Sequence, residues 1–355
     1  MPIESVSGLL IPLGMLLLSL LVLLFCAERL VGASEEIGTS LGVPPFVIGI
    51  TVLAVGTSLP ELVTALFALH DKSSEIVVGT VLGSNIANIL LILGFAAVYA
   101  REITIDWDLL HGDLPMLFGS LLLVGVFIYP VSAADLKVFQ DASQQVASNG
   151  GLPQNRSFIT VLEGVILISG YLLYIYYYTQ QSRQLGNNPG TEEVTGGAGI
   201  GLKPIFWIAV GLIGVPIGAK FTVDAAVEIA EQLLVGKAVV AASMISVGTS
   251  LPELVVSYSA VKRKNFEMAL GNVTGSNIFN TFIVMGVPAV LAPLMGDGSL
   301  LAVGEDSILF VQMPFYVATM FVFLVIVLDK KLTRTEGMIF LLSYVVFISK
   351  LYGFI

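Results

Sequence analysis

The strongest constraint on this chain is a 40-residue stretch that occurs twice, from Val55 to Gly94 and from Val247 to Gly286. The two copies align without a gap at an offset of 192 residues, and 20 of the 40 positions are identical. Each copy places a glutamate directly after a proline in apolar sequence, Glu61 in the first copy and Glu253 in the second. A charged side chain inside a membrane helix costs on the order of 3 kcal/mol or more, so a duplicated glutamate indicates a function.

The composition of the chain places this duplication in a membrane. Of all residues, 56% are apolar and 12% are charged, whereas soluble domains average about 25% charged residues. A helix that spans a bilayer needs about 20 mostly apolar residues. Ten such runs are expected, at residues 8–27, 42–68, 75–99, 113–131, 158–178, 202–231, 237–260, 267–293, 307–328 and 337–354. We therefore predict an all-α integral membrane protein with ten transmembrane helices.

The two copies predict two inverted repeats. The first comprises residues 1–180 with the copy 55–94, the second comprises residues 201–355 with the copy 247–286, and the polar residues 181–200 form a linker. Each half holds five predicted spans, an odd number, so the two copies enter the membrane from opposite sides. Inverted repeats whose broken helices meet at the midplane are typical of secondary transporters.

The basic residues predict the orientation. With both termini outside, ten Lys and Arg residues fall in cytoplasmic loops and six fall elsewhere, in agreement with the positive-inside rule. We expect a multi-pass protein of the cell (inner) membrane, whose partners are the lipid bilayer and transported cations. The formal net charge of −10 argues against a nucleic-acid partner, and a monomer is the simplest oligomeric state.

Each copy also contains a proline that predicts a broken helix. Proline lacks an N–H and clashes with the carbonyl four residues earlier, so Pro60 frees the carbonyl of Gly56 and Pro252 frees that of Gly248. A free carbonyl in hydrocarbon is costly unless it is buried in protein or faces a cavity or a ligand. The two prolines therefore predict breaks at the midplane that supply oxygen atoms to an ion.

Side chains that carry oxygen gather around each glutamate. Thr57 and Ser58 lie four and three residues before Glu61, so the three share one helix face. The pattern recurs in the second copy and in the span after each motif: Thr249, Ser250 and Glu253; Ser84 and Asn88; Ser276 and Asn280. Ca²⁺ binds about six to eight oxygen atoms, and two carboxylates balance the charge of one Ca²⁺ or two Na⁺.

Each of these side chains also has a structural explanation. The hydroxyls can bond to the carbonyls that the prolines free, and the glutamates can form a structural carboxylate pair. Asn85 and Asn277, in the middle of the two Gly-Ser-Asn motifs, can equally well bond to neighbouring helices. A cation channel can use the same oxygen atoms as a transporter.

No feature of the sequence predicts an enzyme or a bound cofactor. The single cysteine, Cys26, is incompatible with an internal disulfide or a thiolate cluster. The chain has no HExxH motif, and its two histidines, His70 and His111, fall near the ends of predicted spans. An intramembrane protease is therefore disfavoured.

The motif GTSLPEL followed by GSNIxN, present twice in inverted halves, resembles the alpha-repeats of the calcium/cation antiporter superfamily, in particular prokaryotic sodium/calcium exchangers. The resemblance implies a secondary active antiporter that exchanges calcium for sodium by alternating access. It also implies a core of eight spans that holds four ion sites in a diamond, with the first and sixth helices as a sliding gate.

The resemblance further implies a set of ligands in this sequence. The calcium site would consist of Glu61 and Glu253 with the carbonyls of Thr57 and Thr249. The sodium sites would add Ala54, Ser58 and Ser84 on one side and Ser246, Ser250 and Ser276 on the other, and Asn88 and Asn280 would lie at the centre.

Two positions depart from the family pattern. Some prokaryotic members carry an aspartate where this chain has Asn280, and an alanine is familiar at Ser246. A proton/calcium exchanger that uses the same glutamates in protonated form remains the main alternative, because burial raises the pKa of a carboxyl group.

Overall fold

The computed structural model describes residues 3–70, 74–128, 158–186, 201–232, 248, 250–295, 300–303 and 308–353. These residues are almost entirely helical, and η marks a π-helical segment below. In chain order the helices are α1 (Ile3–Leu41), α2 (Pro45–Ile48), η1 (Gly49–Leu53), α3 (Ala54–His70), α4 (Glu75–Ala87), η2 (Asn88–Leu93), α5 (Gly94–Ala100), α6 (Asp113–Ile128), α8 (Val161–Gly186), α9 (Leu202–Gln232), α11 (Leu251–Lys262), α12 (Phe266–Phe279), η3 (Asn280–Val284), α13 (Gly286–Met295), η4 (Ile308–Gln312), α14 (Met313–Asp329) and α15 (Arg334–Leu351).

Seven helical stretches of the described chain are long and apolar enough to cross a bilayer. They are Leu9–Leu41, Pro45–His70, Ile76–Ala100, Val161–Tyr178, Leu202–Ile229, Phe266–Met295 and Phe310–Asp329. Large apolar side chains cover their outer faces and those of α6, and Leu17, Leu122 and Leu162 are 62%, 69% and 69% exposed. An apolar exterior of this kind requires lipid around it, so the chain is a multi-pass membrane protein.

Three predicted spans have shorter or incomplete counterparts. Helix α6 has 16 residues and α15 has 18. The predicted span at 237–260 corresponds to α11, whose preceding residues lie outside the described chain. Helix α8 continues to Gly186, into the segment 181–200 that was predicted as a linker.

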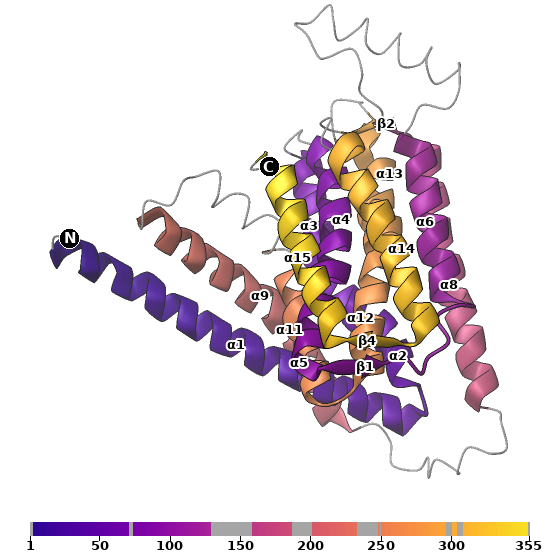
Figure 1. The fold of residues 1–355 in the computed structure, drawn as a ribbon, viewed down its shortest axis with the longest axis horizontal. Coiled ribbons are helices and arrows are strands. Elements are labelled where there is room, and N and C mark those ends of the chain that lie inside the picture. Colours follow the sequence, from indigo (N-terminus) through magenta and orange to yellow (C-terminus); the bar gives the residue numbers. More distant parts are fainter. Residues whose placement is uncertain are drawn as a thin grey trace, which may run out of the picture.

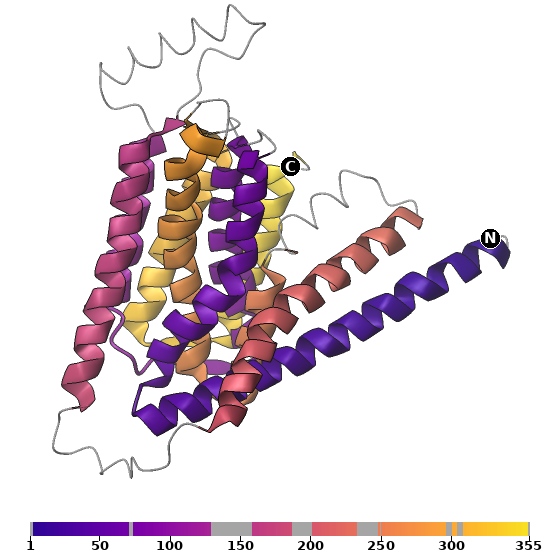
Figure 2. The same cartoon turned by 180° about the vertical axis from the view of Figure 1, so that it is seen from behind.

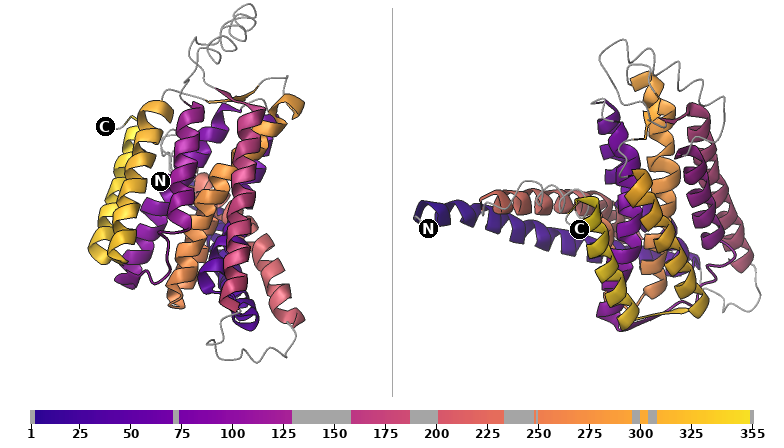
Figure 3. Two further views of the ribbon diagram at one scale, coloured as in Figure 1. Left: turned by 90° about the vertical axis from the view of Figure 1, so that its right-hand side faces the viewer. Right: turned by 45° about the horizontal axis from the view of Figure 1, so that its top comes forward.

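Helices α1 and α9 pair with each other and run obliquely to the other helices, which form an upright bundle (Figures 1 and 2). In the tilted view of Figure 3 the pair projects sideways from this bundle. The guanidinium carbon of Arg29 on α1 lies 4.8 Å from the ring centroid of Trp207 on α9. Arg263 after α11 lies 3.4 Å from a carboxylate oxygen of Glu35, which holds the end of α1 to the bundle.

Two short antiparallel ribbons close opposite ends of the bundle (Figure 1). Strand β1 (Glu102–Thr104) pairs with β4 (Lys331–Thr333), and β2 (Phe158–Ile159) pairs with β3 (Leu301–Ala302). Each ribbon therefore joins a strand from the first half of the chain to a strand from the second half.

The helices after β2 and β4 begin with the same capping arrangement. At the start of α8, the main-chain N–H of Thr160 donates to Glu163 Oε2 at 2.6 Å and the Glu163 N–H donates to Thr160 Oγ1 at 3.3 Å. Thr333 and Glu336 form the same reciprocal pair at α15. This is a capping box, which satisfies two N–H groups at the start of a helix.

A glycine after each capping box brings two helix backbones together. A Cβ on Gly164 would lie 2.9 Å from the carbonyl oxygen of Gly286, and a Cβ on Gly337 would lie 2.8 Å from the carbonyl oxygen of Gly94. Gly94 and Gly286 are the final residues of the two duplicated stretches. Helix α8 thus packs against the second copy, and α15 packs against the first.

The predicted helix break at Pro60 is wrong. Helix α3 runs from Ala54 to His70 with Pro60 inside it, because one proline removes a single helical hydrogen bond and the rest of the helix remains paired. The irregular backbone lies earlier, in η1. In the second copy, Ser250 lies just before α11 and Pro252 lies in the first turn of that helix. A proline in the first turn removes no helical hydrogen bond.

Candidate ion-binding site

Two carboxylates are buried inside the bundle without a basic partner among the described residues. Glu61 is 1% exposed and Glu253 is 0% exposed, and their carboxyl groups are close enough to interact electrostatically. Both oxygens of Glu61 and Oε2 of Glu253 have no hydrogen-bond partner among the described residues. An ionised carboxylate that is buried without a partner is very unfavourable, so this pair requires a cation or a proton.

A third buried carboxylate shows how the same chain stabilises a structural acid. Asp113 at the start of α6 is 0% exposed. Its Oδ1 accepts a hydrogen bond from the hydroxyl of Tyr174 at 2.8 Å, and its Oδ2 accepts one from the hydroxyl of Tyr178. Glu61 has no such hydroxyl donor in the described part of the chain, which argues against the structural explanation for that glutamate.

Hydroxyl groups of α3 and α12 meet beside Glu253. Ser58 Oγ donates to Glu253 Oε1 at 2.9 Å. Thr57 Oγ1 lies 3.4 Å from the carbonyl oxygen of Ala54 and 3.5 Å from Ser276 Oγ. The structure therefore brings together the expected ligands Ala54, Thr57, Ser58, Glu253 and Ser276.

Two buried amides stand where a π-helical segment begins in each copy. Asn88 starts η2 and Asn280 starts η3, and both are 0% exposed. Asn88 Nδ2 donates to Asn277 Oδ1 at 2.9 Å, whereas Asn88 Oδ1 and both polar atoms of Asn280 have no partner within the described chain. Single π-helical turns occur often at functional sites.

Asn85 and Asn277 hold helices together. Asn85 Nδ2 donates to Thr281 Oγ1 at 2.9 Å and lies 3.3 Å from the hydroxyl of Tyr316. Asn277 Nδ2 donates to the carbonyl oxygen of Asn85 at 3.2 Å. These contacts favour the structural explanation for the two asparagines.

The site is thus a cluster of buried oxygens, several of them unsatisfied. Those without a partner in the described part of the chain are Glu61 Oε1 and Oε2, Glu253 Oε2, Asn88 Oδ1, Asn280 Oδ1 and Ser250 Oγ. Leaving one such atom unpaired costs about 1–3 kcal/mol, so a cluster of them indicates a missing ligand. Ser84 is buried as well, at 3% exposed, while Thr249 and Ser246 lie outside the described residues.

The ligand chemistry favours a hard cation. Among the described residues there is no group of three or more His, Cys, Asp and Glu side chains, the usual ligands of transition metals. Carboxylate, hydroxyl and amide oxygens are instead the ligands of Ca²⁺ and similar ions.

Two further residues of this region were not predicted from the sequence. Asn272 and Ser257 are buried and hydrogen-bonded to each other at 2.9 Å. The aligned positions of the first copy are Thr80 and Ala65. In the sequence, these two residues are marked only by the difference between the copies. A comparison that looks for identical residues at aligned positions does not detect them.

A family model described as "Sodium/calcium exchanger protein" matches residues 11–180 and 203–353. This chain belongs to that family. It is 32% identical over 299 residues to the "Inner membrane protein YrbG" of Escherichia coli K12, which covers 82% of this chain and 83% of the relative. It is also 32% identical, over an alignment of 356 residues, to the "Sodium/calcium exchanger MaX1" of Methanosarcina acetivorans, covering 95% of this chain and 97% of that relative.

Solved structures of an exchanger have the same fold. A structure of the sodium-calcium exchanger NCX_Mj superposes with a TM-score of 0.75 at 28% sequence identity, covering 96% of this chain and 99% of the other. Family membership and fold both fit a cluster of buried oxygens between membrane helices.

Proposed function

We propose that this chain is a secondary antiporter that exchanges calcium for sodium across the membrane by alternating access. The observation that carries the proposal is the pair Glu61 and Glu253, which is fully buried and has no basic partner among the described residues. The relative named a sodium/calcium exchanger and the fold of NCX_Mj support the same ions.

In this proposal, calcium binds to Glu61 and Glu253 with the main-chain carbonyls of Thr57 and Thr249. Sodium ions bind with Ala54, Ser58 and Ser84 on one side and Ser246, Ser250 and Ser276 on the other, and Asn88 and Asn280 line the centre. The two carboxylates carry a charge of −2, which one Ca²⁺ or two Na⁺ neutralise. Calcium and a full set of sodium ions therefore compete for the same glutamates, and this competition makes transport an exchange.

The ten-helix inverted repeat is part of the proposal. It is supported by the two ribbons at opposite ends of the bundle and by the matching capping boxes and glycine contacts of α8 and α15. We place residues 1–180 in the first repeat and 201–355 in the second, with both termini outside the cell.

Helices α1 and α9 are proposed as the moving gate. The side chain of Leu212 on α9 fills the space beside Gly56, and the side chain of Val223 lies beside Gly248. These two glycines begin the GTSLPEL motif in each copy. A shift of α9 along its axis therefore changes the packing at the glycine of both motifs, which precedes each glutamate by five residues.

Calcium flux in proteoliposomes tests the proposal and separates the alternatives. Radioactive calcium uptake should follow an imposed sodium gradient and stop when the gradient is removed. Uptake driven by a pH gradient and indifferent to sodium would establish the proton exchanger instead. Uptake that persists without any counter-ion would establish a channel.

The variants Glu61→Gln and Glu253→Gln test the residues. Each should abolish calcium uptake, because a neutral amide cannot balance the charge of the ion. The matched control is Glu102→Gln, which removes an exposed carboxylate on β1 and should leave uptake unchanged. Near-normal flux in either buried variant would overturn the assignment.

A further inference from the structure

Asn272 on α12 connects three helices behind the ion site. Its side chain is 0% exposed. Its Oδ1 lies 3.3 Å from Thr57 Oγ1 on α3, and its Nδ2 lies 2.9 Å from Ser257 Oγ and 3.4 Å from the main-chain oxygen of Glu253, both on α11. One amide thus contacts two of the residues that carry the proposed site.

The hydrogen-bond chemistry of this amide has one consistent arrangement. A side-chain amide has two N–H donors and one carbonyl acceptor, and the main-chain oxygen of Glu253 can only accept. The NH₂ group must therefore face α11, which turns Oδ1 toward Thr57. An amide oxygen cannot donate, so the hydroxyl of Thr57 must be the donor in this contact.

The Thr57 proton has two acceptors of this kind, Asn272 Oδ1 at 3.3 Å and the carbonyl oxygen of Ala54 at 3.4 Å. A cation bound to the Ala54 carbonyl repels this proton, so the O–H then points at Asn272 and the lone pairs of the Thr57 oxygen face the cation. Ser276 Oγ, a ligand proposed for the other sodium position, lies 3.5 Å from the same oxygen.

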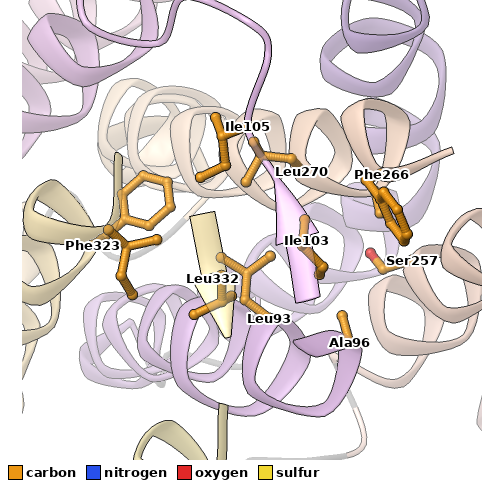
Figure 4. Close-up of a pocket in the computed structure, with 11 residues that line it drawn as sticks. Leu93, Ala96, Ile103, Ile105, Ser257, Phe266, Leu270, Phe323 and Leu332 are labelled. Atoms are coloured by element: carbon orange, nitrogen blue, oxygen red, sulfur yellow. The ribbon is translucent and has the colours of Figure 1, made fainter. Parts of the chain in front are cut away.

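Ser257 supports the position of the Asn272 side chain. Its side chain lines an apolar cavity, and the other ten residues around that cavity are all apolar (Figure 4). The cavity therefore offers the Ser257 hydroxyl no polar alternative to Asn272. The Ser257 hydroxyl anchors the amide, and the carbonyl oxygen of Glu253 fixes its orientation, because rotation of the amide would turn Oδ1 toward an oxygen that cannot donate.

The first copy lacks this pair. The positions that align with Asn272 and Ser257 are Thr80 and Ala65, and a threonine beside an alanine provides neither the amide nor its hydroxyl partner. The two sides of the site therefore differ behind the glutamates, although GTSLPEL itself is the same in both copies.

We propose that Asn272 is a positioning residue that orients the Thr57 hydroxyl to bind sodium, and so makes the sodium position on the Thr57 side stronger than its counterpart. The inference rests on the proposed sodium/calcium exchange. Asn272 does not touch the ion; it acts through Thr57.

The test converts the second copy to the residues of the first. The double variant Asn272→Thr with Ser257→Ala should raise the sodium concentration that half-saturates calcium efflux by about three- to tenfold, the effect of losing one hydrogen bond. Sodium-free exchange of calcium for radioactive calcium should keep its KM and maximal rate within about twofold, because the carbonyl ligands remain. A loss that is equal in both assays would assign Asn272 a structural role and overturn the inference.

Two further variants keep the test decisive. Ser257→Ala alone removes one hydroxyl from an apolar cavity and should still raise the half-saturating sodium concentration. No change in that variant would overturn the inference even if the double variant does not fold.

The control is Thr274→Val. The hydroxyl of Thr274 donates to the main-chain oxygens of Leu270 and Gly271 in its own helix, so the sodium dependence of this variant should match that of the wild type. If the wild-type protein performs neither reaction, the proposed function has failed, and not the role of Asn272 alone.

Discussion

The hydroxyl of Ser58 donates a 2.9 Å hydrogen bond to the carboxylate of Glu253, a residue 195 positions later in the chain. The bond crosses from one duplicated motif to the other. Its counterpart does not form, because Ser250 Oγ and both oxygens of Glu61 have no partner among the described residues. Two motifs of identical sequence therefore hold their glutamates differently.

This difference predicts unequal effects of two matched substitutions in ion-free protein. Ser58→Ala should lower the free energy of unfolding by about 1.5–3 kcal/mol, since it removes a hydrogen bond to a buried charged group. Ser250→Ala should change it by less than about 0.5 kcal/mol, because no hydrogen bond is lost. Thermal unfolding of the detergent-solubilised protein in the presence of a chelator measures both. Equal losses would contradict the asymmetry described here.

The unpaired carboxylate of Glu61 predicts that the empty protein is less stable than its Glu61→Gln variant. Without calcium or sodium, Glu61→Gln should raise the melting temperature, because it removes a buried charge that has no partner. Addition of calcium should reverse the order, since a ligand at about 100 times its Kd stabilises the wild type by about 2.7 kcal/mol and the variant gains little. Melting curves with chelator and with calcium test both halves of this prediction.

Asp113→Asn is the control for that experiment. The carboxylate of Asp113 accepts hydrogen bonds from Tyr174 and Tyr178, so its neutralisation should not stabilise the empty protein, and calcium should stabilise this variant as it does the wild type. Calcium stabilisation of Glu61→Gln that equals that of the wild type would place the ion elsewhere.

Close backbone packing beside the site predicts a large effect of a single methyl group. A Cβ on Gly49 would lie 2.5 Å from the carbonyl oxygen of Met268 and 3.0 Å from the main-chain nitrogen of Asn272. Neither atom can move without shifting α12, so Gly49→Ala should destabilise the protein by about 1–3 kcal/mol. Gly14→Ala is the control, since no heavy atom lies within 4 Å of a Cβ there, and it should be neutral or stabilising.

The proposed topology predicts which loops are reachable from outside the cell. Residue Ser143 lies between the fourth and fifth predicted spans. In a Cys26→Ala background, a cysteine introduced there by Ser143→Cys should react with an impermeant thiol reagent in intact cells. Ser182→Cys, after the fifth span, should react only in everted vesicles. Both cysteines reacting from the same side would contradict the inverted repeat.

The duplication in the sequence singled out four polar residues that the structure buries. Glu61, Glu253, Asn88 and Asn280 stand out because the same residue occurs at aligned positions in apolar sequence, and all four are buried. Duplication reveals only what the copies share. Asn272 and Ser257 have no equivalent in the first copy, so their contact became visible only when α11 and α12 were seen side by side.

The course of the backbone was predicted only in part. Proline at residue 60 predicted a break, but α3 continues through it because the packed helix tolerates the loss of one hydrogen bond. The π-helical segments that begin at Asn88 and Asn280 have no comparable sequence marker. The capping boxes could have been predicted, since Ile-Thr-x-x-Glu-Gly at 159–164 and Leu-Thr-x-x-Glu-Gly at 332–337 fit the threonine and glutamate spacing of that motif.

The contact between Gly94 and Gly337 has a consequence for biogenesis. Gly94 closes the first duplicated stretch, yet the surface that packs against it belongs to α15, which leaves the ribosome more than 200 residues later. During synthesis the helices of the first copy therefore lack the packing surface of α15 until that helix has been inserted. The end of the first copy is fully packed only after α15 has inserted, so a chain released before α15 should be recognised and degraded as an incomplete protein.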